Sequence, residues 1–435
     1  MAIRRDPGFR SDITIPVLVI GAGACGFSAA LAAQAEGADV LILERDATPA
    51  GSTAMSYGGI CAADTAVQAR QGISDTAAAF EADILAITDG QTDPALARTI
   101  ARHSGPALDW LTETLGFDLD VEVNWRGFGH RVPRVHFPPG RSGSTLLGMF
   151  QNAAEAAGID VLTRARVRDL IVDDQDRVMG VTVERPDGLE DIGCHQLVLA
   201  CCGYGADREL IARHMPELAN ARYYGHEGNE GDALKWGQAL GAAVGDLSAY
   251  QSLGSLSDPE CLVIPHTLMI GGGVQINSRG ERFENELDDI SGQALTILAQ
   301  PNHICWIVYD QRLHDQALAG FDEYRDGLKV NAYRSADSFE ALAERLGLPV
   351  DRFARTMAQV EAMKAAGRTD AFGRTFAAAD ALSPPYYAVK VTGALFHTQG
   401  GLCVDDHARV VRPDGSTLPN LLAGGGAARS VSGPS

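Results

Sequence analysis

The sequence lacks any apolar run close to the ~20 residues that a membrane-spanning helix needs. The opening residues, MAIRRDPGFRSDITIP, contain arginines but no apolar core, so we expect no secretory signal. Basic residues are also scarce: 36 Lys and Arg stand against 56 Asp and Glu, which gives a formal net charge of −20. This negative charge argues against nucleic acid and anionic membranes as partners.

The eight cysteines form no C-x-x-C pair and no C-x-x-C-H motif, which excludes an attached c-type haem. We expect no metal site, and we expect reduced thiols in a cytoplasmic protein. A chain of 435 residues with 46% apolar residues and 48 glycines is typical of a glycine-rich α/β enzyme. Its length exceeds what one core supports, so we expect two domains.

The stretch VLVIGAGACG at residues 17–26 places an apolar, non-alternating strand directly before Gly21, Gly23 and Gly26. An alanine-rich helix over residues 27–35 and a second apolar strand over residues 40–43 follow, which completes a βαβ unit. In such a turn the glycines allow the bend, the approach of a pyrophosphate, and close helix–strand packing. Glu44 then ends the second strand, where a carboxylate can accept hydrogen bonds from a ribose diol. These features predict a dinucleotide site.

Further along the chain, several segments have backbone N–H groups or charged side chains that could contact a ligand. Residues 51–59 are rich in glycine and small hydroxyl residues, so this loop can lie flat against a planar group. Residues 125–143 form the most cationic stretch of this acidic chain. Residues 167–172 and 179–184 alternate and predict a hairpin, and the strand at 196–200 ends on small residues. Asp232 opens a helix.

From about residue 246 the βαβ rhythm disappears and helical segments dominate, such as 338–346 and 350–366. We therefore predict a dinucleotide-binding domain over residues 1–245 and 383–435, interrupted by an inserted domain over 246–382.

Seven stretches of the sequence match, in the same order along the chain, motifs of one known protein family. The chain resembles the flavoprotein subunits of fumarate reductase and succinate dehydrogenase, a family that also includes urocanate reductase, aspartate oxidase, tricarballylate dehydrogenase and 3-ketosteroid Δ1-dehydrogenase. The matching stretches are VLVIGAGACG, GSTAMSYGGI, LVLACCGYG, GNEGDALKWGQALGA, INSRGERFENE, GALFHTQGGLCVDDHARVV and LPNLLAGGGAARSVSG. The resemblance implies FAD in a Rossmann-like domain, with an inserted α+β capping domain that closes over the flavin. Family members usually continue with a final helix, so the printed sequence is expected to be either truncated or unusual at this end.

The resemblance also implies which residues bind FAD. Glu44 corresponds to the ribose acid, Val167 to a backbone contact with adenine. The remaining positions belong to the pyrophosphate turn, the flavin segment, the third strand end and the ribityl segment: Gly21, Gly23, Ala24, Gly26; Ser52, Thr53, Ser56, Gly58, Gly59; Ala200, Cys201, Gly203; Gly424, Gly425. Respiratory members attach FAD covalently through a histidine in the flavin segment. That position is Ser52 here, so we expect noncovalent FAD.

The catalytic set of the family is only partly present. His397 matches the histidine that binds a substrate carboxylate, although a structural histidine beside the glycine turn is the alternative. Arg429 lies in the last motif and can grip a carboxylate, or it is a surface arginine. The proton-donating arginine of fumarate reductases is missing after Asn285-Glu286, which argues against fumarate as substrate. Arg282 is expected to be a structural ion-pairing residue.

The proton acid or base has two weak candidates, His266 and Tyr387. We predict an FAD-dependent oxidoreductase that moves a hydride between flavin N5 and a carbon next to a carboxylate or carbonyl, with an unidentified electron donor or acceptor. The alternatives are a flavin oxidase that acts on a C–N bond, as aspartate oxidase does, and a flavin-binding protein without turnover.

Overall fold

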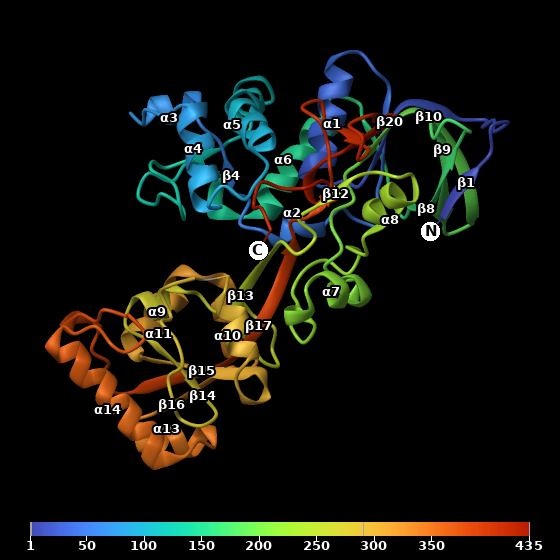
Figure 1. Cartoon of the computed structure of the whole chain (residues 1–435). Helices are drawn as coiled ribbons and strands as arrows, with labels where there is room; N and C mark the ends of the chain where they lie inside the picture. Colours follow the sequence, from blue (N-terminus) through green and yellow to red (C-terminus); the bar gives the residue numbers. More distant parts are fainter. Residues whose placement is uncertain (1, 290, 435) are drawn as a thin grey trace. The chain divides into compact units, whose positions relative to one another are not determined.

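The computed structural model describes residues 2–289 and 291–434, which form two compact units (Figure 1). The first unit contains Met1–Leu210, Gly225–Tyr250 and His397–Ser435, and the second contains Ile211–Tyr224 and Gln251–Phe396. Strands β13 (Tyr250–Ser257) and β17 (Tyr386–Thr398) run from one unit into the other. These units are defined by contacts alone, so the predicted domain bounds of 246 and 382 for the insertion stay a prediction.

Parallel strands form the centre of the large sheet in the first unit, in the order β20-β10-β2-β3-β7. The two non-alternating apolar runs of the sequence lie at the middle of this sheet, as the end of β2 (Thr14–Ile20) and the whole of β3 (Val40–Leu43). Helix α1 (Ala24–Ala35) packs on it, and helix α6 (Gly143–Ala156) packs against α1 through the stacked rings of Phe27 and Phe150. The βαβ unit and the predicted α/β class are confirmed.

The hairpin predicted from alternation is confirmed as β8 (Arg166–Val172) and β9 (Val178–Arg185), which pair antiparallel. Strand β10 (Gly188–Leu199) is longer than the predicted 196–200 because it pairs with three strands. Its first half pairs antiparallel with β9, and its second half pairs parallel with β2 and β20. The carboxyl end of β10 therefore comes beside the glycine turn that follows β2.

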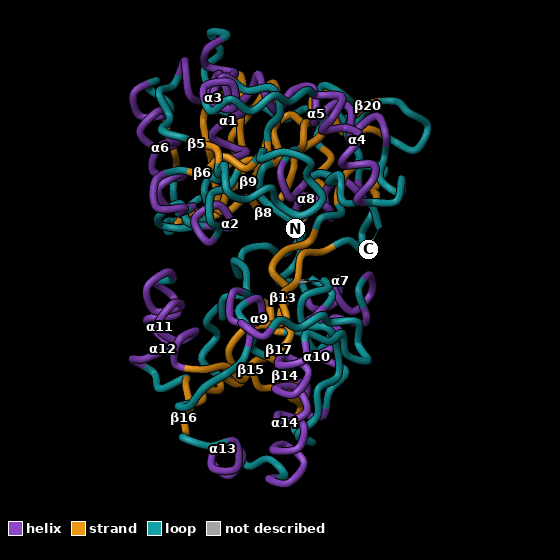
Figure 2. The backbone as a smooth tube through the Cα atoms, turned by 90° about the vertical axis from the view of Figure 1, so that its left-hand side faces the viewer, coloured by secondary structure: helices purple, strands orange, loops and turns teal. Residues whose placement is uncertain are grey.

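The second unit contains a six-stranded sheet among its described residues, in the order β11-β17-β15-β14, with β13 and β16 also paired to β17. Figure 2 shows strands β13 to β17 beside the helices of this unit. Helices α13 (Phe339–Leu346) and α14 (Val350–Ala366) lie where predicted. Among the described residues between 246 and 382, helical residues outnumber strand residues, as predicted. The strands themselves were not predicted, because short apolar runs such as β15 (Ile304–Asp310) cannot be distinguished from helices by periodicity.

The remaining elements complete the chain. The first unit adds β1 (Ala2–Arg5), α2 (Gly51–Met55), β4 (Ile60–Cys61), α3 (Ala66–Arg70), α4 (Ala77–Ile87), α5 (Pro94–Asp109), β5 (Asp120–Val121), β6 (Val135–Phe137), β7 (Asp160–Leu162), α8 (Asp232–Ala239), β12 (Val244–Gly245), β18 (Gly401–Leu402), β19 (Arg409–Val411) and β20 (Thr417–Ala423). The second adds β11 (Arg222–Tyr223), α9 (Thr267–Ile270), β14 (Val274–Asn277), α10 (Gln293–Leu298), α11 (Gln311–Gly320), α12 (Asp322–Lys329) and β16 (Tyr333–Ala336), and α7 (Arg208–His214) spans both units. Within the described ranges, every helix is too short or too polar to span a bilayer.

Candidate functional site

The turn between β2 and α1 requires glycine at two positions for reasons of space. Gly21 has φ = +105°, and a Cβ there would lie 2.5 Å from the carbonyl oxygen of Ala200 at the end of β10. A Cβ on Gly26 would lie 1.9 Å from the carbonyl oxygen of Gly21, so only glycine lets α1 begin this close to the turn. Both glycines are therefore explained by packing inside the protein.

Gly23 differs from Gly21 and Gly26 because no backbone atom crowds its Cβ position, which borders a pocket. The nearest atom to a Cβ on Gly23 would be the hydroxyl oxygen of Thr53, 3.3 Å away, so the position is open on its other sides. The Thr53 hydroxyl accepts a hydrogen bond from the backbone N–H of Ala24 at 3.0 Å. The first-turn N–H groups of α1 have no intrahelical acceptors and form the positive end of the helix. This cradle fits a phosphate group.

Glu44 connects the glycine turn to the end of β3. It is 8% exposed, and its two carboxylate oxygens accept hydrogen bonds from the N–H groups of Ala22 and Asp46, each at 3.0 Å. Each oxygen keeps a second lone pair, so these two bonds leave acceptor capacity for a ribose diol. Glu44 thus has a structural function in the turn in addition to the predicted one.

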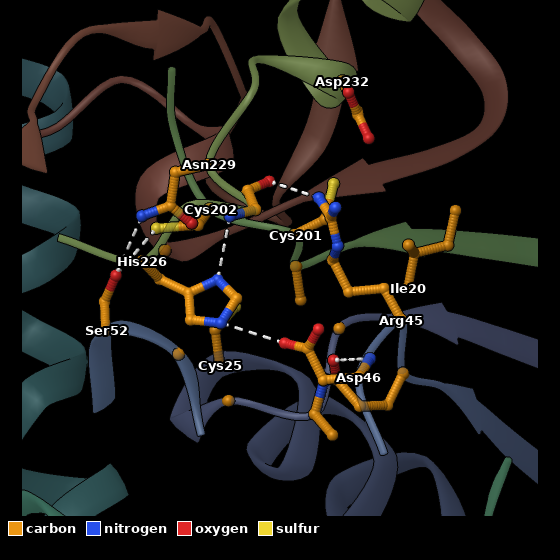
Figure 3. Close-up of a pocket in the computed structure, with 18 of the residues that line it drawn as sticks. Ile20, Cys25, Arg45, Asp46, Ser52, Cys201, Cys202, His226, Asn229 and Asp232 are labelled. Atoms are coloured by element: carbon orange, nitrogen blue, oxygen red, sulfur yellow. Dashed lines mark hydrogen bonds and ion pairs between the residues drawn. The ribbon is translucent and has the colours of Figure 1, made fainter. Parts of the chain in front are cut away.

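A cavity of about 270 Å³ runs along this turn. Figure 3 shows labelled side chains from its walls. The predicted cofactor residues that line it are Gly21, Gly23, Ala24, Glu44, Ser52, Thr53, Val167, Ala200, Cys201 and Gly425. The other predicted residues, Gly26, Ser56, Gly58, Gly59, Gly203 and Gly424, lie outside its wall. Their assignment to FAD stays a prediction.

The residues outside this wall pack against neighbouring backbone and rings. A Cβ on Gly59 would lie 2.8 Å from the Phe137 ring, and one on Gly203 would meet the Thr398 hydroxyl. Gly424 faces the thiol of Cys25 in the same way. The close approach of other segments therefore leaves little room for a side chain at these three positions.

A segment that precedes α8 is tied to the end of β3 by charged groups (Figure 3). His226 Nδ1 accepts from the N–H of Gly228 at 3.0 Å, so Nε2 carries the hydrogen that it donates to the Asp46 carboxylate at 2.9 Å. Arg45 donates to the carbonyl oxygen of Gly228 at 2.9 Å and contacts the Glu230 carboxylate at 3.3 Å. All of these residues except Glu230 line the cavity.

Three buried polar atoms in the cavity lining have no hydrogen-bond partner among the described residues. They are Asp232 Oδ1, Trp236 Nε1 and Arg166 Nε. Desolvation raises the pKa of Asp232, because burial disfavours its carboxylate form. A polar ligand with hydroxyl groups and ring nitrogens would satisfy such atoms, so the pocket fits the adenosine and pyrophosphate portion of a dinucleotide.

Sequence reasoning missed several of these lining residues. Asp232 and its neighbours were noted as the start of a helix, but their proximity to the glycine turn depends on contacts over about two hundred residues of sequence separation. The residues that were missed are Cys25, Arg45, Asp46, Arg166, Cys202, His226, Asn229, Asp232 and Trp236. Some of them stand directly beside a predicted residue in the sequence, as Arg45 does beside Glu44 and Cys202 beside Cys201. This adjacency was the available signal.

Ser52, which stands where the resemblance places the covalent histidine, is held by two side chains. Asn229 donates its amide to the Ser52 hydroxyl at 3.2 Å, and the Cys202 thiol lies 3.3 Å from the same oxygen. Asn229 is buried and comes from the segment that precedes α8. The hydroxyl is therefore fixed at the cavity wall.

His397 and Arg429 both belong to the first unit but differ in how they are held. The ring of His397 is exposed by its accessible surface, although the protein around it desolvates the imidazolium and lowers its pKa. A ligand can reach the ring through this accessible surface. Arg429 instead donates to the carboxylates of Asp246 at 2.6 Å and Asp93 at 3.2 Å. Its guanidinium ties two segments of the unit together.

The two acid/base candidates lie in the second unit. His266 precedes α9, and its buried Nδ1 has no hydrogen-bond partner among the described residues. Burial lowers the pKa of this ring. Tyr387 on β17 donates its hydroxyl to Gln311 at 2.8 Å and stacks on His314 at 4.2 Å. Tyr387 is thus part of a packed aromatic cluster.

Comparison with protein families places almost the whole chain in one of them. Residues 16–434 match the family described as FAD binding domain. A probable fumarate reductase of Shewanella frigidimarina is 32% identical over 425 residues, which covers 97% of this chain and 71% of that protein. A urocanate reductase of Eggerthella lenta is 25% identical over 96% of this chain and 70% of that protein.

Solved structures show the same fold. The open conformation of a flavocytochrome c3 fumarate reductase superposes with a TM-score of 0.87 at 31% identity, over 97% of this chain and 74% of that one. A 3-ketosteroid-Δ4-(5α)-dehydrogenase from Rhodococcus jostii gives a TM-score of 0.77 at 24% identity, over 99% and 94% of the two chains. The second likeness concerns the fold alone.

Proposed function

The chain belongs to the FAD binding domain family and is an FAD-dependent oxidoreductase of CH–CH groups, and on that premise we propose that its substrate is an α,β-unsaturated carboxylate or carbonyl compound, or the saturated counterpart. The observation that carries the proposal is the cavity along the glycine turn. Its open position at Gly23 and its unpartnered atoms on Asp232, Trp236 and Arg166 fit a dinucleotide.

FAD, when bound there, supplies a hydride acceptor or donor at flavin N5. The chain contributes the cradle of N–H groups at the start of α1, the carboxylate of Glu44 and the buried Asp232. The segment at residues 226–230, fixed by the pair of His226 and Asp46, covers one side of the cavity. These groups bind and orient the cofactor, so that its reactive ring is presented at a constant position.

Substrate recognition is assigned to His397 in preference to Arg429. Arg429 is occupied by two carboxylates, and a substrate would have to compete with Asp246 and Asp93 for it. The accessible ring of His397 can hold a carboxylate when protonated or polarise a carbonyl as a hydrogen-bond donor when neutral. Its lowered pKa favours the neutral form near pH 7.

The proton donor or acceptor is assigned to His266 in preference to Tyr387. His266 keeps an unpartnered ring nitrogen, whereas the hydroxyl of Tyr387 is bonded to Gln311. Relatives of this chain are named as reductases of fumarate, acrylate and urocanate. The missing arginine after Asn285-Glu286 leads us to expect a substrate other than fumarate.

The proposal includes noncovalent FAD, because Ser52 cannot form the histidyl link of the respiratory members. It also includes a separate electron donor or acceptor and a cytoplasmic location. The eight cysteines are free thiols, as is typical of a reducing compartment.

The test begins with the purified protein loaded with FAD. Acid precipitation should release the yellow flavin into the supernatant, whereas a covalent link would leave it in the pellet. Anaerobic photoreduction, followed by a panel of unsaturated acids and enones, should then identify compounds that reoxidise the flavin. Reoxidation by oxygen with stoichiometric peroxide on amine substrates, and by no member of the panel, would instead favour a C–N oxidase.

His397→Ala separates substrate binding from cofactor binding. We expect FAD to remain bound and turnover on the best compound of the panel to fall about 100-fold, as for loss of one oriented polar contact. His407→Ala is the matched control, since His407 is an exposed histidine of the same unit that lies outside the cavity lining. Unchanged turnover in His397→Ala would remove His397 from the site.

A further inference from the structure

The loop between β5 and β6 presents large apolar side chains to solvent. Trp125 is 51% exposed and Phe128 is 77% exposed, and both lie within four residues of one loop. Arg126, between them, is also exposed. Isolated exposed apolar residues are common, but a tryptophan and a phenylalanine that flank an arginine have the composition of interface hot spots.

The charge of this loop is opposite to that of the chain as a whole. Arg131 in this loop and Arg141, in the turn that follows β6, add two exposed guanidinium groups, with side chains 61% and 58% exposed. Their carboxylate partners lie deeper, since the side chains of Asp83 and Glu122 are 4% and 15% exposed. The surface that faces solvent is therefore cationic, on a chain whose formal net charge is −20.

The loop is held in place by buried contacts. Arg134, which is fully buried, donates to Asp75 at 2.6 Å and 2.8 Å and to Asp83 at 2.5 Å. At its other side, Gly129 packs against Ile87 at the end of α4, because a Cβ there would meet Ile87 at 2.9 Å. The aromatic and cationic groups are thus presented from a fixed base, which lowers the conformational entropy lost on binding.

The same loop is joined to the segment that the resemblance places along the flavin. The rings of Trp125 and Phe137 lie 6.4 Å apart, and the Arg141 guanidinium lies 5.4 Å from the Phe137 ring. Phe137 packs directly on Gly59, where a Cβ would lie 2.8 Å away. One aromatic ring therefore separates the exposed Trp125 from the flavin segment.

We propose that this surface, formed by Trp125, Arg126, Phe128 and Arg141, docks a small acidic one-electron carrier protein that exchanges electrons with FAD. The inference rests on the proposed function, since it needs a flavin that turns over. Each reduced carrier is oxidised by one electron, and two encounters, with one proton from solvent, reduce the bound flavin. Charge complementarity speeds the encounter, and the two aromatic side chains supply the desolvated contact.

Binding can be measured apart from turnover. The probes are an acidic plant-type [2Fe–2S] ferredoxin and, as the opposite charge, a basic c-type cytochrome, each titrated against the FAD-loaded protein by calorimetry at low salt. We expect the ferredoxin to bind, with an affinity that falls as salt rises, and the cytochrome to bind at least ten times more weakly. Equal affinities, or no ferredoxin binding, would overturn the proposal.

Two variants locate the surface. Arg126→Glu should weaken ferredoxin binding about 5-fold to 10-fold at low salt, and Trp125→Ala/Phe128→Ala should weaken it more than 10-fold at any salt. Arg355→Glu is the control, since Arg355 is an exposed arginine on α14 of the second unit. Wild-type affinity in both loop variants would overturn the proposal, as would a dimer of this chain that Trp125→Ala/Phe128→Ala converts to monomers.

Turnover measurements then test the proposed function and the docking surface separately. With dithionite as a small electron donor, the loop variants should reduce the best substrate at the wild-type rate, whereas ferredoxin-driven reduction should be lost in parallel with binding. The proposed function would be contradicted if the wild type neither reduced any panel compound with dithionite nor oxidised a saturated counterpart with a small electron acceptor. Intact ferredoxin-driven turnover in the loop variants would contradict the docking surface alone.

Discussion

Two buried carboxylates, one in each unit, have opposite surroundings. Asp232 in the first unit is 9% exposed and has an oxygen without a partner among the described residues, and burial raises its pKa. Glu286 in the second unit is 0% exposed, and its pKa is lowered. Burial alone would raise the pKa of Glu286 too, but the guanidinium of Arg282, with that of Arg374, outweighs it.

Glu286 is satisfied entirely by its own unit. One oxygen accepts from the N–H of Gln275 at 3.0 Å and from Arg282 at 2.9 Å, and the other accepts from Arg282 and Arg374 at 2.7 Å each. Arg282 also pairs with Asp370. The ion-pairing function expected for Arg282 is thus what the structure displays. The contrast teaches that a paired buried charge serves the fold, whereas an unpaired one at a cavity is available to a ligand.

The largest effect is expected from Glu286→Ala, which removes the paired carboxylate of the comparison. Two buried guanidinium groups lose their shared carboxylate, so we expect the unfolding free energy of the second unit to fall by about 3–5 kcal/mol. Urea unfolding in the absence of FAD measures this loss. Glu281→Ala is the control, because Glu281 forms a surface ion pair with Arg352 and should cost less than about 1 kcal/mol. Equal losses in the two variants would contradict the assignment.

A smaller effect is expected from Glu284→Gln, near the same cluster. Desolvation raises the pKa of Glu284 to about 7, and one of its buried oxygens has no partner among the described residues. In the unfolded chain a glutamate titrates near pH 4.3, so the folded state holds an extra proton between about pH 4 and pH 7. Stability therefore decreases as pH rises through this window, by at most about 3 kcal/mol.

The Gln variant lacks this titration. Its stability relative to the wild type should increase steadily from pH 4.5 to pH 7.5 and then level off, as followed by urea unfolding at several pH values. The Thr296 hydroxyl, which donates to the Glu284 carboxylate, can donate to the Gln oxygen as well. Parallel stability curves for the two proteins would show that Glu284 titrates normally.

The smallest effect is expected from Asp232→Ala, which removes the carboxylate that has an unpartnered oxygen among the described residues. The apoprotein should keep or slightly gain stability, because an unpartnered buried acid is removed, while the Kd for FAD should rise about 10-fold through loss of a hydrogen bond. Flavin fluorescence titration measures the Kd. Asp207→Ala is the control, since Asp207 pairs with Lys235 at 2.7 Å and lies outside the cavity lining. Unchanged FAD affinity in Asp232→Ala would show that the unpartnered carboxylate oxygen of Asp232 does not bind the cofactor.

Local patterns were sufficient for the elements that surround the glycine turn. The apolar runs of β2 and β3, the hairpin of β8 and β9 and the helix α14 all follow from periodicity within about ten residues. The second-unit sheet did not follow, because strands such as β14 and β15 pair with each other and with β17 at long sequence separation. Arg429 shows the same limit: its partners, Asp93 and Asp246, are 336 and 183 residues away.

By itself the sequence determined that a dinucleotide turn exists and which glycines form it, because the spacing of Gly21, Gly23 and Gly26 is a local property of one strand–turn–helix. Only the tertiary structure decided which charges are used by the fold and which are left over. Arg374 reaches Glu286 from 88 residues away and Asp246 reaches Arg429 from 183 residues away, whereas one oxygen of the buried Asp232 has no partner among the described residues. Burial and such long-range pairing depend on segments that meet only after folding, and no spacing along the chain encodes them.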